Sequence, residues 1–307
     1  MESFCNGNLK YLFLIFTIAI FSLHNANAES AKEYQVGVSL VNIGEIDKMI
    51  GTYDLDFWYS ISSDTEDLIE NTPPELDFLN GRIDSIQSEF SSQSIIEKRV
   101  SGKFTSEMDF RDFPFEKIKL QIIIEPQTQW STENTVLVVN PSSGVDKSAT
   151  IPGWYISDSN FIVKENSYGS DSKYSQYVAE FTIQRNVLGS FLKVIFPIVI
   201  ILGISFVAYI IPKNYGIVAE LSLLPLLALV FFHIDTLNQI PPLGYLTIFD
   251  KLMIVSYVLI ANNVISTGRQ VRAHEIADDN RSWHLNNWHL KITPLIIIVS
   301  LVLLYFV

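Results

Sequence analysis

The order of apolar and polar positions divides the chain into two parts. Between residues 29 and 186, apolar and polar residues alternate in short runs separated by Gly, Pro, Asn and Ser. Such alternation is typical of strands with one buried face, so this part is predicted to be an all-β sandwich or barrel. The predicted strands are residues 35–41, 52–61, 117–124, 135–139, 160–164 and 177–183, whereas the pattern of residues 76–90 is ambiguous.

The pattern changes at Val187. Apolar stretches follow at about residues 187–212, 216–240, 245–267 and 288–307. Each has the roughly 20 residues that a helix needs to cross a bilayer. Residues 187–307 are therefore predicted to be a transmembrane domain of four helices, joined to the β-domain without a linker.

The first 28 residues have the pattern of a secretory signal peptide. Lys10 precedes a short apolar run at residues 11–23, and Ala26-Asn27-Ala28 provides small residues for cleavage. The alternative is a first transmembrane anchor, but the run is shorter than the ~20 residues that a spanning helix requires.

Basic residues predict the orientation of the helices. Lys213 follows the first apolar stretch, and Arg269, Arg272, Arg281 and Lys291 surround the connection between the third and fourth. Residues 238–244, between the second and third, contain no Lys or Arg. Because basic loops stay in the cytoplasm, the β-domain is expected to be extracellular or periplasmic, on a plasma or inner membrane.

Composition agrees with this division. The 307 residues are 48% hydrophobic and carry a formal net charge of −12, with a mean hydropathy of +0.25. No basic surface is available for nucleic acid, so nucleic-acid binding is excluded. The only cysteine, Cys5, lies in the predicted signal peptide, which excludes a scaffold held by disulfides.

The sequence offers no enzyme active site. Gly-x-Ser-x-Gly, phosphate-loop and dinucleotide motifs are absent. His284 and His289 have no acidic residue between them, so a zinc site is weakly supported, and His233 and Asp235 point to different faces of the predicted helix. We therefore expect no catalytic residues, no metal and no cofactor.

One segment carries a family resemblance. It runs from Asp109 to Leu120 and contains Phe113-Pro114-Phe115 followed by Glu116. With Gly153-Trp154, Arg185, Pro197 and the Pro241–Tyr245 segment in the same order, the chain resembles the pentameric ligand-gated ion channels of the Cys-loop receptor superfamily, in the prokaryotic branch without the loop disulfide. The resemblance implies an extracellular β-sandwich, a four-helix membrane bundle, and a homopentamer that admits ions in response to an extracellular ligand or protons.

The second apolar stretch is the expected pore helix. At helical spacing, one stripe contains Glu220, Leu224, Leu227, Phe231, Ile234 and Asn238. In a pentamer Glu220 would form a ring of carboxylates that favours permeant cations, and the apolar rings could gate by dewetting. The alternatives are an interfacial Glu that reaches solvent and an apolar stripe that packs in a core. Pro225 can kink this helix.

The resemblance also implies which residues couple the two domains. They are Asp47, Lys48, Asp112, Phe113, Pro114, Phe115, Arg185, Pro241 and Tyr245. An arginine at a strand-to-helix junction needs a carboxylate partner, and Asp47 or Asp112 is expected to pair with Arg185. Such a pair can differ between two states, or it can be a static salt bridge.

The expected ligand site lies between subunits. Trp130, Tyr168 and Tyr174 are candidates on one face, with Phe57 and Tyr59 on the other. Aromatic cages bind cationic amines, but these rings could instead belong to the core, and carboxylates could sense protons. The predicted function is a cation-selective ligand-gated channel, with an unidentified small molecule or protons as the ligand. A non-conducting membrane sensor or scaffold of the same fold is the alternative.

Overall fold

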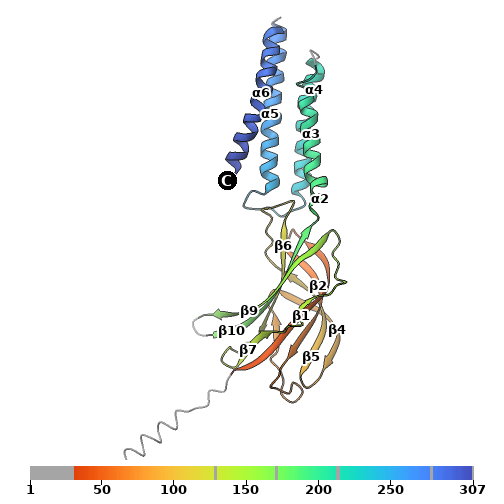
Figure 1. The fold of residues 1–307 in the computed structure, drawn as a ribbon, viewed down its shortest axis with the longest axis vertical. Coiled ribbons are helices and arrows are strands. Elements are labelled where there is room, and N and C mark those ends of the chain that lie inside the picture. Colours follow the sequence, from red (N-terminus) through yellow and green to blue (C-terminus); the bar gives the residue numbers. More distant parts are fainter. Residues whose placement is uncertain (1–30, 128–129, 170–171, 212–214, 277–278, 306–307) are drawn as a thin grey trace, which may run out of the picture.

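The computed structural model describes residues 31–127, 130–169, 172–211, 215–276 and 279–305. Two β-sheets form one part, and a group of long helices stands at one end of them (Figure 1). This arrangement agrees with the predicted order of a β-sandwich followed by helices. The predicted signal peptide, residues 1–28, lies outside the described residues.

The two sheets have simple strand orders. The first contains β4 (Gly81–Ser91), β5 (Ile95–Thr105), β2 (Thr52–Ser62), β1 (Lys32–Asp47) and β7 (Thr135–Val139), with the short β8 (Gly144–Val145) also paired to β1. The second contains β3 (Leu76–Phe78), β6 (Lys117–Pro126), β10 (Ser172–Arg185) and β9 (Trp154–Tyr168). β1 pairs in parallel with β7 and β8, and the other neighbours are antiparallel.

The core lies between the sheets, where alternate residues point inward. On β6, Ile118, Leu120, Ile122 and Ile124 are all fully buried. Phe104 of β5 lies among other aromatic rings of both sheets, in contact with Phe57, Phe78 and Tyr53. The alternation therefore confirms the all-β prediction for this part of the chain.

Four strands, β3, β4, β5 and β8, were not foreseen in the sequence. β5 contains Glu97, Lys98 and Arg99 in succession, which interrupts the apolar alternation, yet Lys98 pairs with Glu89 and Arg99 with Asp56 across neighbouring strands. Residues 76–90 contain β3 and β4 with a turn between them.

Asn80 holds that turn in place. Its amide donates to the carbonyls of Thr105 and Gln121 and its oxygen accepts from the Ile123 N–H. Since Thr105 belongs to the first sheet and Gln121 and Ile123 to the second, Asn80 ties the two sheets together.

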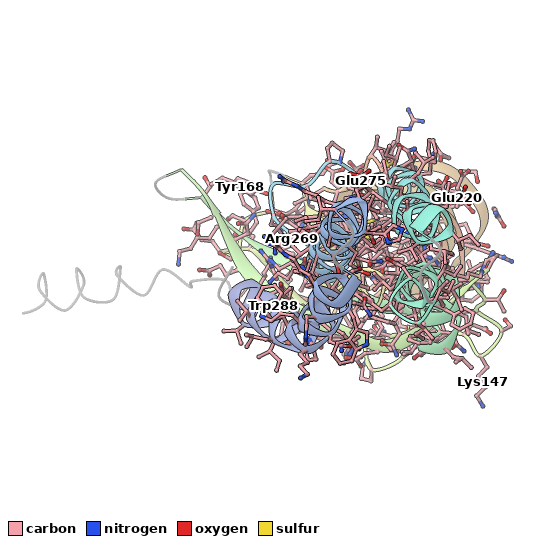
Figure 2. The ribbon with its side chains drawn as sticks, turned by 90° about the horizontal axis from the view of Figure 1, so that it is seen from above. Lys147, Tyr168, Glu220, Arg269, Glu275 and Trp288 are labelled. Carbon is pink, nitrogen blue, oxygen red and sulfur yellow. The ribbon has the colours of Figure 1, made fainter. Side chains whose placement is uncertain are left out.

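The helices begin directly after β10. α2 (Val187–Ser190), a π-helical turn (Phe191–Ile195) and α3 (Phe196–Val207) form one segment, followed by α4 (Tyr215–Leu237), α5 (Ile248–Glu275) and α6 (Asp279–Tyr305). α4 packs against α3 and α5, and α6 packs against α5. Seen along the helices, α4 and α6 lie on different sides of the group, with Glu220 and Trp288 well apart (Figure 2).

Three helical segments of the described residues are long and apolar enough to cross a membrane: 187–207, 216–237 and 248–275. The fourth span stays a prediction. The first segment ends at Val207, before the expected residue 212, whereas α5 continues beyond the expected residue 267 and α6 begins well before residue 288. α5 and α6 extend beyond the predicted apolar stretches because the contact between them is polar in the added parts, as in the hydrogen bond from Gln270 Nε2 to Asn286 Oδ1 (3.3 Å).

The sheets make a specific prediction at Gly102 of β5. A Cβ at this position would lie 2.5 Å from the carbonyl oxygen of Arg82 on β4, whereas a Cβ at Gly144 would have no atom within 4 Å. We expect Gly102→Ala to lower the free energy of unfolding by about 1–3 kcal/mol and Gly144→Ala to change it by less than about 0.5 kcal/mol. Denaturant unfolding followed by circular dichroism measures both. Equal stability of the two variants would show that β4 and β5 are not as close as described.

Candidate functional site

The loop before β6 caps the first turn of α5. Ile248 N–H donates to Arg111 O (3.0 Å) and Phe249 N–H to Phe113 O (3.1 Å). The Phe113 ring is buried and meets the Phe249 ring edge-on, with centroids 5.8 Å apart. The first N–H groups of a helix lack intrahelical partners, so the β-domain satisfies donors that α5 cannot satisfy itself.

The sequence of α5 completes this cap. Thr247 Oγ1 accepts from the Asp250 N–H (3.1 Å), and the Asp250 carboxylate accepts from the Thr247 N–H (2.9 Å). This reciprocal pair is a capping box. The loop and the capping box together fix the first turn of α5 against the β-domain.

Tyr245 makes a second contact between the domains. Its hydroxyl accepts from the Phe110 N–H (3.0 Å) and lies 3.4 Å from Asp109 Oδ1. The Arg111 guanidinium lies 5.0 Å from the centre of the Tyr245 ring and pairs with Asp109 (2.9 Å). The connection between α4 and α5 is thereby held against the β-domain.

A buried charge cluster lies beside these contacts. Glu116 is completely buried, and its Oε1 lies 3.5 Å from Lys48 Nζ and 3.5 Å from Arg185 Nε. Trp154 lies against both cations, with its ring centre 4.7 Å from the Arg185 guanidinium and 5.5 Å from Lys48 Nζ. Because Arg185 ends β10 and Val187 begins α2, this cluster stands where the chain enters the helices.

Charge in the cluster is not balanced. Two cations share one carboxylate, and Glu116 Oε2 and Arg185 Nε make no hydrogen bond in the described part of the chain. Burial, and then the positive charge of Arg185, lower the pKa of Lys48 below its usual value. A buried set with unmet hydrogen bonds is only weakly favourable, so it can rearrange at low cost.

The structure corrects the expected partner of Arg185. The Asp47 carboxylate accepts from the Met49 N–H (2.9 Å) within its own turn, and the Asp112 side chain is exposed. The carboxylate near Arg185 is instead Glu116, which is buried next to the loop motif. Its position directly after Phe115 was the signal in the sequence.

The other predicted coupling residues lie near by. Pro114 and Phe115 belong to the loop that caps α5, and the Phe113–Pro114 peptide bond is cis. Pro241 lies in the connection between α4 and α5, a few residues before Tyr245. Lys48, Phe113, Arg185 and Tyr245 are thus brought to one junction.

The predicted pore stripe lies on the exposed face of α4. Every side chain of the stripe is exposed in this chain: Glu220, Leu224, Leu227, Phe231, Ile234 and Asn238. The opposite face packs against α5, where Ser222 Oγ lies 2.8 Å from Thr267 Oγ1 and Leu229 is fully buried. α4 remains helical through Pro225, which is buried and so lies off the stripe.

One residue of the predicted ligand site, Tyr168, contacts a carboxylate that sequence reasoning missed. Glu125 is buried, and its Oε2 accepts from the Tyr168 hydroxyl (3.0 Å) and Gln176 Nε2 (3.0 Å). The rings of Tyr168 and Tyr174 lie 5.8 Å apart. Trp130 lies in the loop before β7, with its indole Nε1 buried and without a hydrogen bond in the described residues. A negative charge behind aromatic rings suits a cationic group.

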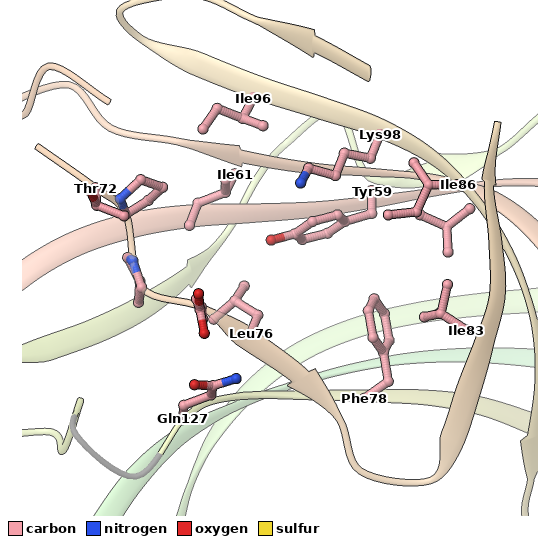
Figure 3. Close-up of a pocket in the computed structure, with 14 residues that line it drawn as sticks. Tyr59, Ile61, Thr72, Leu76, Phe78, Ile83, Ile86, Ile96, Lys98 and Gln127 are labelled. Atoms are coloured by element: carbon pink, nitrogen blue, oxygen red, sulfur yellow. The ribbon is translucent and has the colours of Figure 1, made fainter. Parts of the chain in front are cut away.

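The two residues predicted for the opposite ligand face lie elsewhere. Phe57 is fully buried in the core against Phe78 and Phe104, so this prediction is wrong. Tyr59 is nearly buried, and its hydroxyl faces a cavity of about 390 Å³ within the same chain (Figure 3). Alternation on β2 points Phe57 and Tyr59 to the interior, which aromatic content alone did not reveal.

The chain is 25% identical over 163 residues to a proton-gated ion channel of Gloeobacter violaceus, which is 52% of this chain and 45% of that protein. The match thus spans less than half of the relative's length. No family model matches the chain.

The charge cluster leads to a paired prediction. Glu116→Gln leaves Lys48 and Arg185 without their carboxylate, and we expect a loss of about 3–5 kcal/mol in the free energy of unfolding. Lys48→Met leaves a one-to-one pair and removes a buried charge, so a change of less than about 1 kcal/mol is expected. Denaturant titration of the purified chain measures both. A larger loss for Lys48→Met than for Glu116→Gln would contradict the charge assignment.

Proposed function

We propose that this chain is the subunit of a homopentameric, cation-selective channel, gated by an extracellular ligand or by protons, with α4 lining the pore. The observation that carries the proposal is the α4 stripe, which stays exposed while the opposite face of α4 packs against α5. The β-domain lies outside the cell membrane in this proposal, and α6 is the fourth span.

Glu220 distinguishes the stripe from a lipid-facing surface. A carboxylate within a membrane segment costs about 2.5–3.5 kcal/mol on insertion scales unless it faces water or a partner. Among the described residues, no ion pair or hydrogen bond joins the Glu220 side chain to the rest of the chain. A water-filled path along α4 would satisfy this carboxylate, and five copies would attract cations.

The junction provides a route from ligand to pore. The β-domain holds the outer end of α5 through the loop at Phe113, and Arg185 joins β10 to the first helix. Both α3 and α5 pack against α4. The similarity to a proton-gated ion channel supports a channel function, and the buried Glu125 beneath Tyr168 and Tyr174 supports a ligand with a cationic group.

Reversal potentials in planar bilayers test this proposal. In a KCl gradient we expect cation-selective current, and Glu220→Gln should move the reversal potential toward zero because the carboxylate ring is lost. Glu275→Gln is the control, since Glu275 is the last residue of α5, which packs against α4, and does not belong to the stripe.

Three outcomes would contradict the proposal. Anion selectivity would exclude the Glu220 ring, and an equal effect of both variants would exclude α4 as the pore helix. A sealed bilayer across a pH series and a panel of small amines would favour the non-conducting sensor or scaffold.

A further inference from the structure

A chain of polar side chains joins α3, α5 and α6 on the side of the helices away from the α4 stripe. His289 Nδ1 of α6 lies 2.9 Å from Asn262 Oδ1 of α5. Asn262 Nδ2 lies 3.4 Å from Thr293 Oγ1 and 3.3 Å from the Tyr209 hydroxyl, beyond the end of α3. His289 and Thr293 are both buried, so α6 is attached here by polar contacts.

The Thr293 hydroxyl determines which atoms donate and which accept in these hydrogen bonds. The Thr293 hydroxyl donates to the His289 carbonyl (2.9 Å), so toward Asn262 it can only accept. The Asn262 amide nitrogen therefore faces Thr293, and its oxygen faces His289. Because an amide oxygen only accepts, His289 must carry its hydrogen on Nδ1.

This tautomer leaves one free position on the ring. His289 Nε2 holds a lone pair, is buried, and has no hydrogen-bond partner in the described part of the chain. A proton that binds there would create an imidazolium whose second N–H has no acceptor. A buried donor without an acceptor is costly, so the packed arrangement accommodates only the neutral ring.

The charged groups around His289 do not compensate for an added proton. Arg269 of α5 is the charged group that acts on it across the helix contact. α6 itself carries Arg281, His284 and Lys291, and the side facing α3 presents the Tyr209 hydroxyl. No carboxylate forms an ion pair or hydrogen bond with His289 among the described residues.

We propose that His289 is a proton-sensitive switch between α5 and α6. The neutral ring holds α6 against Asn262, and protonation at Nε2 favours an arrangement in which α6 has moved and the new N–H reaches water. Since α5 is capped by the β-domain and packs on α4, the position of α6 can bias both. Only this last step rests on the proposed channel function.

The chain contains a matched control. Two tryptophan–histidine neighbours occur on α6: the rings of Trp288 and His289 lie 5.0 Å apart, and those of Trp283 and His284 lie 5.1 Å apart. His289 is buried, whereas His284 is exposed. His284→Asn therefore removes a titratable histidine of the same helix without removing a contact between helices.

Distances between spin labels test the switch without ion flux. Cys5 is the only cysteine, so in a Cys5→Ser background labels are placed at the exposed Ile265 of α5 and Ile298 of α6. In vesicles, acidification from pH 8 to pH 5 should lengthen the distance in the parent and in His284→Asn. His289→Asn keeps a donor for Asn262 but cannot bind the proton, so the change should be lost.

A second variant keeps the test decisive if His289→Asn does not fold. Asn262→Asp places a carboxylate against Nδ1, which offsets the charge of the imidazolium in the packed arrangement but supplies no acceptor for Nε2, so acid should lengthen the distance less although His289 remains. A parent without an acid response, a response that persists in His289→Asn, or an undiminished response in Asn262→Asp overturns the switch. A distance change in a chain that carries no current contradicts the channel and leaves the switch standing.

Discussion

The junction depends on one buried carboxylate that two cations share. Glu116 is fully buried, and it pairs with Lys48 and Arg185, which are partly buried beside Trp154. Taking these charges out of water costs several kcal/mol per ion before their attraction is counted. Since Arg185 is the last residue of β10, the position of the first helix is tied to this balance of charge. A shift of the β1–β2 turn that carries Lys48 would change the balance and thereby act on the start of that helix.

The second connection between the domains differs in kind. The loop at Phe113 meets α5 through an aromatic contact and two backbone hydrogen bonds, which close packing makes hard to deform. α5 is also the most buried of the three membrane-length helices in the described part of the chain. One connection is thus apolar and fixed while the other is charged and adjustable.

The sequence predicts a strand or helix well where its buried residues are apolar, and poorly where they are polar. In the β-domain the buried positions are apolar and alternate, so strands such as β2 and β6 were predicted nearly to their ends. β5 was missed because its charged residues are satisfied by cross-strand pairs such as Arg99 with Asp56, which no single strand reveals. α5 and α6 were predicted too short for a related reason, since Gln270 and Ser282, which lie outside the predicted stretches, are polar and buried. Glu116 and Glu125 were not assigned roles because their importance comes from burial, which requires the fold.

The polar residues within the helical part are divided between two sides. Amides, hydroxyls and His289 lie in the contact of α5 and α6 and are satisfied by one another, apart from orphan positions such as His289 Nε2. Glu220 lies on the opposite, exposed side of α4, on a stripe that is otherwise apolar until Asn238. A bilayer can cover apolar side chains on either side, but it cannot satisfy a carboxylate at membrane depth. In the proposed channel the side of α4 is therefore where water is needed, and the α5–α6 side is where the chain replaces water with its own hydrogen bonds.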